Sequence, residues 1–234
     1  MSENDDFTQI MERSKEFMRL AKEHAAKLPP GPEWDGTLPR KREPAASHEE
    51  LARLRGLEVD PDAVRIVVES PAKCPRIAGH AGSEAAAAAV ERFYSDKRLR
   101  LLVLGGSTGR GKSVAATWLA MKLDATWWIS AKDVRVGDEW NGMRSRAMKA
   151  ANLVIDDLGQ ERIEWASGEL GSLIESRFDK GRRTLITTNL PPISNEQRGK
   201  TFASVYGDRL YSRLSKAETG LYVACLGGDL RRQK

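Results

Sequence analysis

Short apolar runs alternate with longer amphipathic segments after Arg100, and this rhythm predicts an α/β fold. The runs are rich in Leu, Val, Ile and Thr, as buried strands are. The segments between them carry apolar residues at helical spacing, which favours parallel strands joined by crossing helices. The predicted strands are Leu101–Leu104, Thr126–Ile129, Leu153–Ile155, Thr184–Thr187 and Leu221–Cys225. The predicted helices cover residues 112–123, 139–150, 164–180 and 207–214.

The first part of the chain has a different pattern, which predicts a small helical module. Between Phe7 and Ala25, apolar residues fall on one helical face. Residues 28–46 hold half of the 10 prolines and indicate an extended linker. Capping signals at Ser47 and Asp60 and an alanine run after Ser83 predict three further helices. The predicted organisation is an amphipathic helix in 1–27, a linker in 28–46, a helical segment in 47–71 and a sheet-containing domain in 72–234.

Composition narrows the class of protein. A chain of 234 residues with 40% hydrophobic positions is long enough for one sizeable core. It holds no apolar run of about 18 residues, and it begins with acidic rather than basic residues. We therefore expect a cytoplasmic protein with no membrane partner. Cys74 and Cys225, with three scattered histidines, give no metal-ligand spacing, so no structural metal is expected.

Charge is distributed unevenly along the chain. The net charge is +5, but residues 1–98 hold 16 basic and 18 acidic residues, whereas residues 99–234 hold 22 basic and 15 acidic residues. A polyanionic partner should therefore meet the second part. The alternative is a surface that is merely solvated by these side chains.

The strongest motif follows the first predicted strand and precedes a predicted helix. It matches G-x-x-x-x-G-K-[ST], whose backbone N–H groups and helix N-terminus bind phosphate. The Lys112 ammonium would reach the β- and γ-phosphates of ATP, and the Ser113 hydroxyl would bind Mg²⁺. The alternative is a glycine-rich turn without a ligand. The motif residues are Gly106, Ser107, Thr108, Gly109, Arg110, Gly111, Lys112 and Ser113.

Polar residues end two other predicted strands. Asp156 and Asp157 follow the apolar run that starts at Leu153, and Asn189 follows the run that starts at Thr184. In open α/β sheets ligands bind at the carboxyl ends of strands. Asp156 would hold magnesium and Asp157 would polarise the attacking water. The motif at residues 106–113 is called the phosphate loop below. If the strand before Asn189 lies between the strand before this loop and the strand before Asp156, Asn189 can contact the same water or the γ-phosphate.

Together these motifs resemble the AAA+ ATPases of the DnaC/IstB kind. The resemblance covers roughly residues 72–232 and includes the segments Tyr206–Leu214 and Leu221–Cys225. It implies a P-loop NTPase fold with a five-stranded parallel sheet flanked by helices and with no C-terminal lid. It also implies that Asn189 is sensor 1, that Arg209 is the arginine finger of a shared nucleotide site, and that Arg231 is sensor 2. Arg213 lies one helical turn from Arg209 and is the alternative finger.

The resemblance also implies partners. Similar proteins load a DnaB-type replicative helicase onto single-stranded DNA. The N-terminal helix would dock on that helicase, or else its apolar face would pack on the other short helices of its own module. A basic region with the aromatic Trp140 would contact DNA, unless it is only a solvated face. Its basic residues are Lys132, Arg135, Arg144, Arg146 and Lys149.

Other functions stay open at this level. One alternative is a transposase-helper ATPase that binds duplex DNA, and others are a P-loop kinase for a small acceptor and a non-hydrolysing scaffold. Asp157 stands where other AAA+ enzymes commonly have glutamate, so we expect slow, switch-like hydrolysis.

Overall fold

The computed structural model describes residues 46–55, 57, 59–69, 71–193 and 199–230, all within the unit formed by residues 43–234. The predicted N-terminal helix, almost all of the linker, and Arg231 lie outside the described residues. The elements are α2 (His48–Arg55), α3 (Pro61–Glu69), α4 (Ala81–Ser95), β1 (Leu101–Gly105), α5 (Lys112–Lys122), β2 (Thr126–Ser130), the 3₁₀ turn η1 (Ala131–Asp133), α6 (Asp138–Lys149), β3 (Asn152–Leu158), α7 (Glu164–Asp179), β4 (Arg183–Thr188), α8 (Phe202–Tyr206), α9 (Asp208–Leu214) and β5 (Gly220–Ala224).

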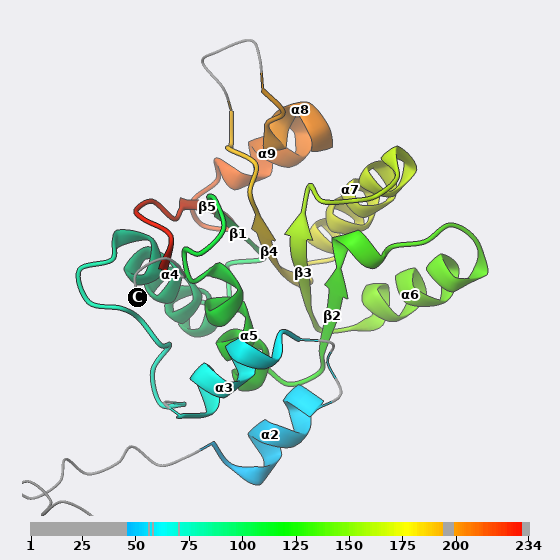
Figure 1. Ribbon diagram of the computed structural model, residues 1–234. Coiled ribbons are helices and arrows are strands. Elements are labelled where there is room, and N and C mark those ends of the chain that lie inside the picture. The colour runs from blue at the N-terminus through cyan, green and yellow to red at the C-terminus, as the bar shows by residue number, and fades with distance from the viewer. Residues whose placement is uncertain (1–45, 56, 58, 70, 194–198, 231–234) are drawn as a thin grey trace, which may run out of the picture. The chain divides into compact units, whose positions relative to one another are not determined.

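The five strands form one parallel sheet in the order β2-β3-β4-β1-β5 (Figure 1). The predicted fold class is confirmed, and all five strands lie where the apolar runs placed them. Because β4 lies between β1 and β3, the carboxyl ends of these three strands are neighbours. The phosphate loop, Asp156 and Asn189 therefore share one edge of the sheet.

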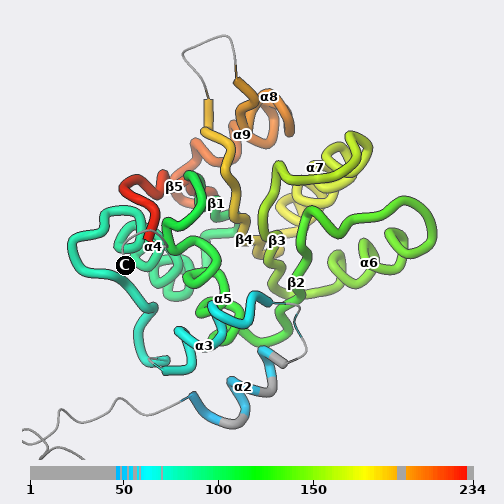
Figure 2. The backbone as a smooth tube through the Cα atoms, in the orientation of Figure 1, coloured from blue at the N-terminus to red at the C-terminus, as the bar shows by residue number. Residues whose placement is uncertain are grey.

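Helices cover both faces of the sheet (Figure 2). Alternation along β1 separates two apolar clusters, because Leu102 and Leu104 face α4 and α5, whereas Leu101 and Val103 face α7 and α9. Leu54 of α2 belongs to the α4–α5 cluster as well. A parallel sheet buried on both faces explains why its strands are nearly continuous apolar runs.

The helix signals of the sequence correspond to the observed caps. Ser47 and Glu50 form the predicted capping box through reciprocal side-chain bonds to backbone N–H groups. Helix α4 begins at Ala81, earlier than Ser83, because the His80 Nδ1 caps it by accepting from the Ser83 N–H. The short helix α8 was not predicted. No described helix has both the length and the apolar character needed to cross a membrane.

Candidate nucleotide site

The phosphate loop joins β1 to α5 and leaves the start of that helix open to a ligand. Gly111 is the N-cap residue at φ 82°, and α5 begins without a side-chain cap. The first N–H groups of an α-helix have no partner within the helix, and the helix dipole makes this end partly positive. The start of α5 is therefore suited to bind an anion such as phosphate.

The segment after β5 packs against the same loop. The Leu230 N–H donates to the Gly109 carbonyl at 2.9 Å, and a Cβ on Gly109 would lie 1.7 Å from the Asp229 Oδ1. The His80 Nε2 lies 2.7 Å from the Gly228 carbonyl, which ties α4 to this segment. Glycine is therefore required at position 109 for two reasons: its φ is 73°, and Asp229 lies too close for a Cβ. Leu230, the residue before Arg231, thus contacts the phosphate loop.

Lys112 is buried with its charge directed at neutral oxygens. Lys112 is only 6% exposed, and its Nζ donates to the Gly106 and Ser107 carbonyls at 2.5 and 2.8 Å. It also donates to the Asn189 Oδ1 at 3.1 Å. Within the described ranges no carboxylate lies within ion-pair distance of this ammonium. Burial lowers the pKa of Lys112, so an arriving anion would relieve the cost of holding this charge.

The two aspartates lie on the neighbouring strand end, next to β4. The Thr187 hydroxyl donates to the Asp156 Oδ1 at 2.5 Å. Burial raises the pKa of Asp156, and the Asp157 charge adds to this rise, while the bond from Thr187 opposes it. Asp157 has a positive φ of 57°, uncommon for a residue other than glycine. The edge thus holds a buried cation and two carboxylates, as phosphoryl chemistry with a divalent cation requires.

The donor set fits magnesium. Asp156 and Ser113 offer oxygen ligands, and a nucleotide-bound Mg²⁺ usually takes one or two protein ligands, with water and phosphate completing the octahedron. Among the described residues, no group of three or more His, Cys, Asp or Glu side chains is placed to hold a metal by itself. Two oxygen donors are compatible with the small protein share in the coordination of a nucleotide-bound Mg²⁺.

Arg209 and Arg213 lie on α9 and differ in exposure. The Arg209 side chain is 73% exposed, and its nearest carboxylates, Glu175 and Asp179, are 4.0 Å away. The Arg213 side chain is 14% exposed, pairs with Asp179 at 2.8 Å and covers the Phe178 ring. Arg209 is therefore free to reach another molecule, whereas Arg213 is held within its own chain.

The basic region includes one error of prediction. Trp140 is 2% exposed and donates its indole N–H to Glu169, so it is a core residue with no face for a base. The helical spacing of α6 directs it toward α7. Among the basic residues, Lys132, Arg135, Arg146 and Lys149 are exposed, whereas Arg144 is partly buried beside Glu169. Lys132 also lies close enough to lower the pKa of Asp156.

Three polar residues near the site carry contacts that the motifs did not predict. The Glu161 carboxylate accepts from the Gly159 N–H, the Ser167 hydroxyl and the Tyr206 hydroxyl, and so links the loop after Asp157 to α8. The Tyr222 hydroxyl donates to the Leu190 carbonyl at 2.6 Å and occupies the space over Gly105. Neither pairing has a sequence signal, because both join residues more than 30 positions apart.

These features define a P-loop NTPase fold of the AAA+ type, and comparison with solved structures agrees. The chain is similar to a structure of DnaI, with a TM-score of 0.52 and 18% identity over 75% of this chain and 95% of that one. The fold that the resemblance implies is thereby confirmed. No protein-family model and no curated protein matches the sequence.

Two further solved structures are similar at lower scores. A DnaC helicase loader gives a TM-score of 0.45 and 23% identity over 64% of this chain and 92% of that one. Domain III of the Thermotoga maritima replication initiation protein DnaA gives 0.46 and 22% identity over 71% of this chain and 68% of that one.

Proposed function

We propose that the protein binds ATP with magnesium at the phosphate loop and hydrolyses it slowly, as a switch. The observation that carries this proposal is the buried Lys112 ammonium, which contacts three neutral oxygens and no carboxylate of the described residues. A buried charge is costly unless it is paired. The γ-phosphate of ATP would provide the missing anion at the open start of α5.

The roles at the site follow from the placement of the side chains. Asp156 and Ser113 would hold Mg²⁺, which when bound neutralises charge on the β- and γ-phosphates. Asp157 would orient the attacking water, and Asn189, already bonded to Lys112, would contact the same water or the γ-phosphate. Arg231 would approach along the segment that ends at Leu230 on the loop.

We further propose self-association with a shared nucleotide site. Arg209 is the candidate finger because it is exposed and has only distant carboxylate neighbours, whereas Arg213 is occupied within its own chain. A guanidinium supplied by an adjoining subunit would stabilise the charge that develops during phosphoryl transfer.

The proposed biological role is that of a helicase loader in DNA replication. It would assemble on single-stranded DNA and deliver or remodel a DnaB-type helicase. The ordered motifs and the likeness in fold to DnaI support this role. Exposed Lys132, Arg135, Arg146 and Lys149 would contact the DNA backbone, so DNA binding should weaken steeply as salt is raised.

Hydrolysis by mixed variants tests the shared site. Lys112→Ala and Arg209→Ala should each reduce ATP hydrolysis, the arginine variant by about three orders of magnitude. Mixing the two should restore part of the activity. The intact phosphate loop of the Arg209→Ala protein can then receive the intact Arg209 of the Lys112→Ala protein. Lys216→Ala removes an exposed cation just beyond α9 and serves as the matched control. Unchanged hydrolysis in Arg209→Ala would contradict the finger assignment.

Binding assays test the partners. Pull-down with a DnaB-type helicase should succeed and pull-down with a transposase should fail. Single-stranded DNA should also bind more tightly than duplex DNA and raise the ATPase rate. The reverse preferences would instead indicate a transposase-helper ATPase.

A further inference from the structure

The register between β3 and β4 breaks at the two aspartates. Ile155 pairs with Ile186, but the next regular pair joins Leu158 to Thr188. Three steps along β3 therefore oppose two along β4, which is a β-bulge. Asp156 and Asp157 occupy the bulge, and Asp157 takes the left-handed φ of 57°. Such bulges redirect side chains, so some contact must hold this one in place.

The Thr187 hydroxyl is that contact. Thr187 is completely buried, and its Oγ1 accepts from the Asp157 N–H at 2.9 Å. The same hydroxyl donates to the Asp156 Oδ1 at 2.5 Å. One group thus gives a partner to the N–H of the strained residue and also fixes one oxygen of the neighbouring carboxylate. Only a side chain that both donates and accepts can do this, so serine could replace threonine here and valine could not.

We propose that Thr187 is a positioning residue, whose hydroxyl holds Asp156 and Asp157 in the orientation that magnesium–nucleotide binding requires. This inference rests on the proposed ATP binding. Residues that bond to metal ligands orient them, and their loss typically weakens metal binding about 10- to 100-fold. Thr187 would thus act through Asp156 and Asp157, without touching the nucleotide.

The test measures equilibrium binding of ATP with and without magnesium, a readout separate from hydrolysis. Thr187→Val keeps the shape of the side chain and removes the hydroxyl. It should weaken binding about 10- to 100-fold with magnesium present and less than about threefold with magnesium chelated. Thr187→Ser should stay within about threefold of the wild type in both conditions, because its hydroxyl can make the same two bonds.

A matched control separates positioning from folding. Thr184 lies near the start of the same strand, is also buried, and accepts a bond from the Arg177 Nε at 3.0 Å. Thr184→Val should lower the stability of the protein, but magnesium should raise its affinity for ATP as much as it does in the wild type. If Thr187→Val does not fold, Thr187→Ala and Thr187→Ser replace it, since these differ by a single hydroxyl.

The possible failures are distinguishable. Wild-type magnesium dependence in Thr187→Val, or a loss in Thr187→Ser as large as that in Thr187→Val, would overturn the positioning role while leaving ATP binding intact. Absence of ATP binding by the wild-type protein would overturn the proposed function itself, and the positioning role with it.

Discussion

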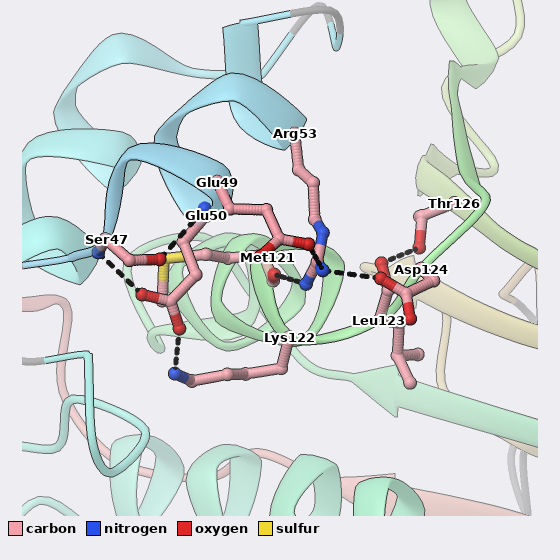
Figure 3. Close-up of polar contacts among 9 residues, drawn as sticks. All are labelled: Ser47, Glu49, Glu50, Arg53, Met121, Lys122, Leu123, Asp124 and Thr126. Carbon is pink, nitrogen blue, oxygen red and sulfur yellow. Dashed lines mark hydrogen bonds and ion pairs between the residues drawn. The ribbon is translucent and has the colours of Figure 1, made fainter.

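Helix α5 carries a partly or fully buried lysine at each end, and the two lysines have different partners. Lys112 at the first turn is surrounded by neutral oxygens of the phosphate loop and Asn189. Lys122 at the last turn pairs with the Glu50 carboxylate of α2, and both side chains are less than one-fifth exposed (Figure 3). Among the described residues, the first end therefore holds a charge with no carboxylate within ion-pair distance, and the second holds a neutralised pair.

The surroundings of Lys122 extend this contrast. Arg53 of α2 pairs with Asp124 at 2.6 Å and with Glu49 at 2.7 Å, and it donates to the Met121 carbonyl (Figure 3). Charges that are matched within the chain fasten α2 to the end of α5. A buried cation that the described part of the chain bonds only to neutral oxygens is instead available to a ligand, and this difference separates the binding end of α5 from the structural end.

The largest expected effect comes from exchanging the two lysines for alanine. Lys112→Ala should weaken ATP binding by about 100-fold or more, because charge-assisted hydrogen bonds to phosphate are lost. Its free energy of unfolding should fall little, since a desolvated charge is removed as well. Lys122→Ala should bind ATP normally and unfold more easily. Calorimetric titration and chemical denaturation of both variants measure the two effects, and equal losses of ATP affinity would contradict the contrast.

The second largest expected effect concerns the conformation of the phosphate loop at the first end of α5. Gly109→Ala would place a Cβ on a residue with φ 73° and only 1.7 Å from the Asp229 carboxylate. We expect a loss of about 1–3 kcal/mol in stability, and ATP binding weakened as the loop shifts. Gly168→Ala is the matched control, because Gly168 lies in α7 with nothing within 4 Å of its added Cβ. Helix propensity predicts that this control is neutral or slightly stabilising, and thermal unfolding compares the two.

The sequence predicts most of this contrast at the binding end and little at the other. Residues 106–113 and the strands around them follow from glycine spacing and apolar runs, which are local signals. The pairs Lys122–Glu50 and Glu161–Tyr206 join residues 72 and 45 positions apart, and no local pattern encodes them. The burial of Trp140 does not follow from the sequence, because spacing gives the face of a helix but not what covers that face. The roles of Asn189 and Arg209 remain predictions.

The arginines of α9 repeat the contrast on a smaller scale. Arg213→Ala should lower stability by about 1 kcal/mol, because it loses the pair with Asp179 and the packing on Phe178. Arg209→Ala should leave the unfolding midpoint unchanged, since its side chain is 73% exposed. Denaturation of both variants measures this difference. A larger loss of stability in Arg209→Ala would contradict the assignment of Arg213 as the structural residue.

The smallest expected effect is the pH dependence of the paired end. The hydrogen bond from Lys122 lowers the pKa of Glu50 below its ordinary value of 4.5, so the folded state favours the charged carboxylate. The pair should therefore contribute about 1 kcal/mol at neutral pH and lose this contribution as the pH falls below the ordinary value toward the lowered one. Glu50→Gln should be less stable than the wild type at neutral pH, with the difference shrinking in acid. In a protein that also carries Lys122→Met, Glu50→Gln should cost less stability at neutral pH, because the partner that lowers the pKa of Glu50 is gone. A wild-type advantage that stays constant from neutral pH to about pH 3 would contradict a contribution from the Lys122–Glu50 ion pair.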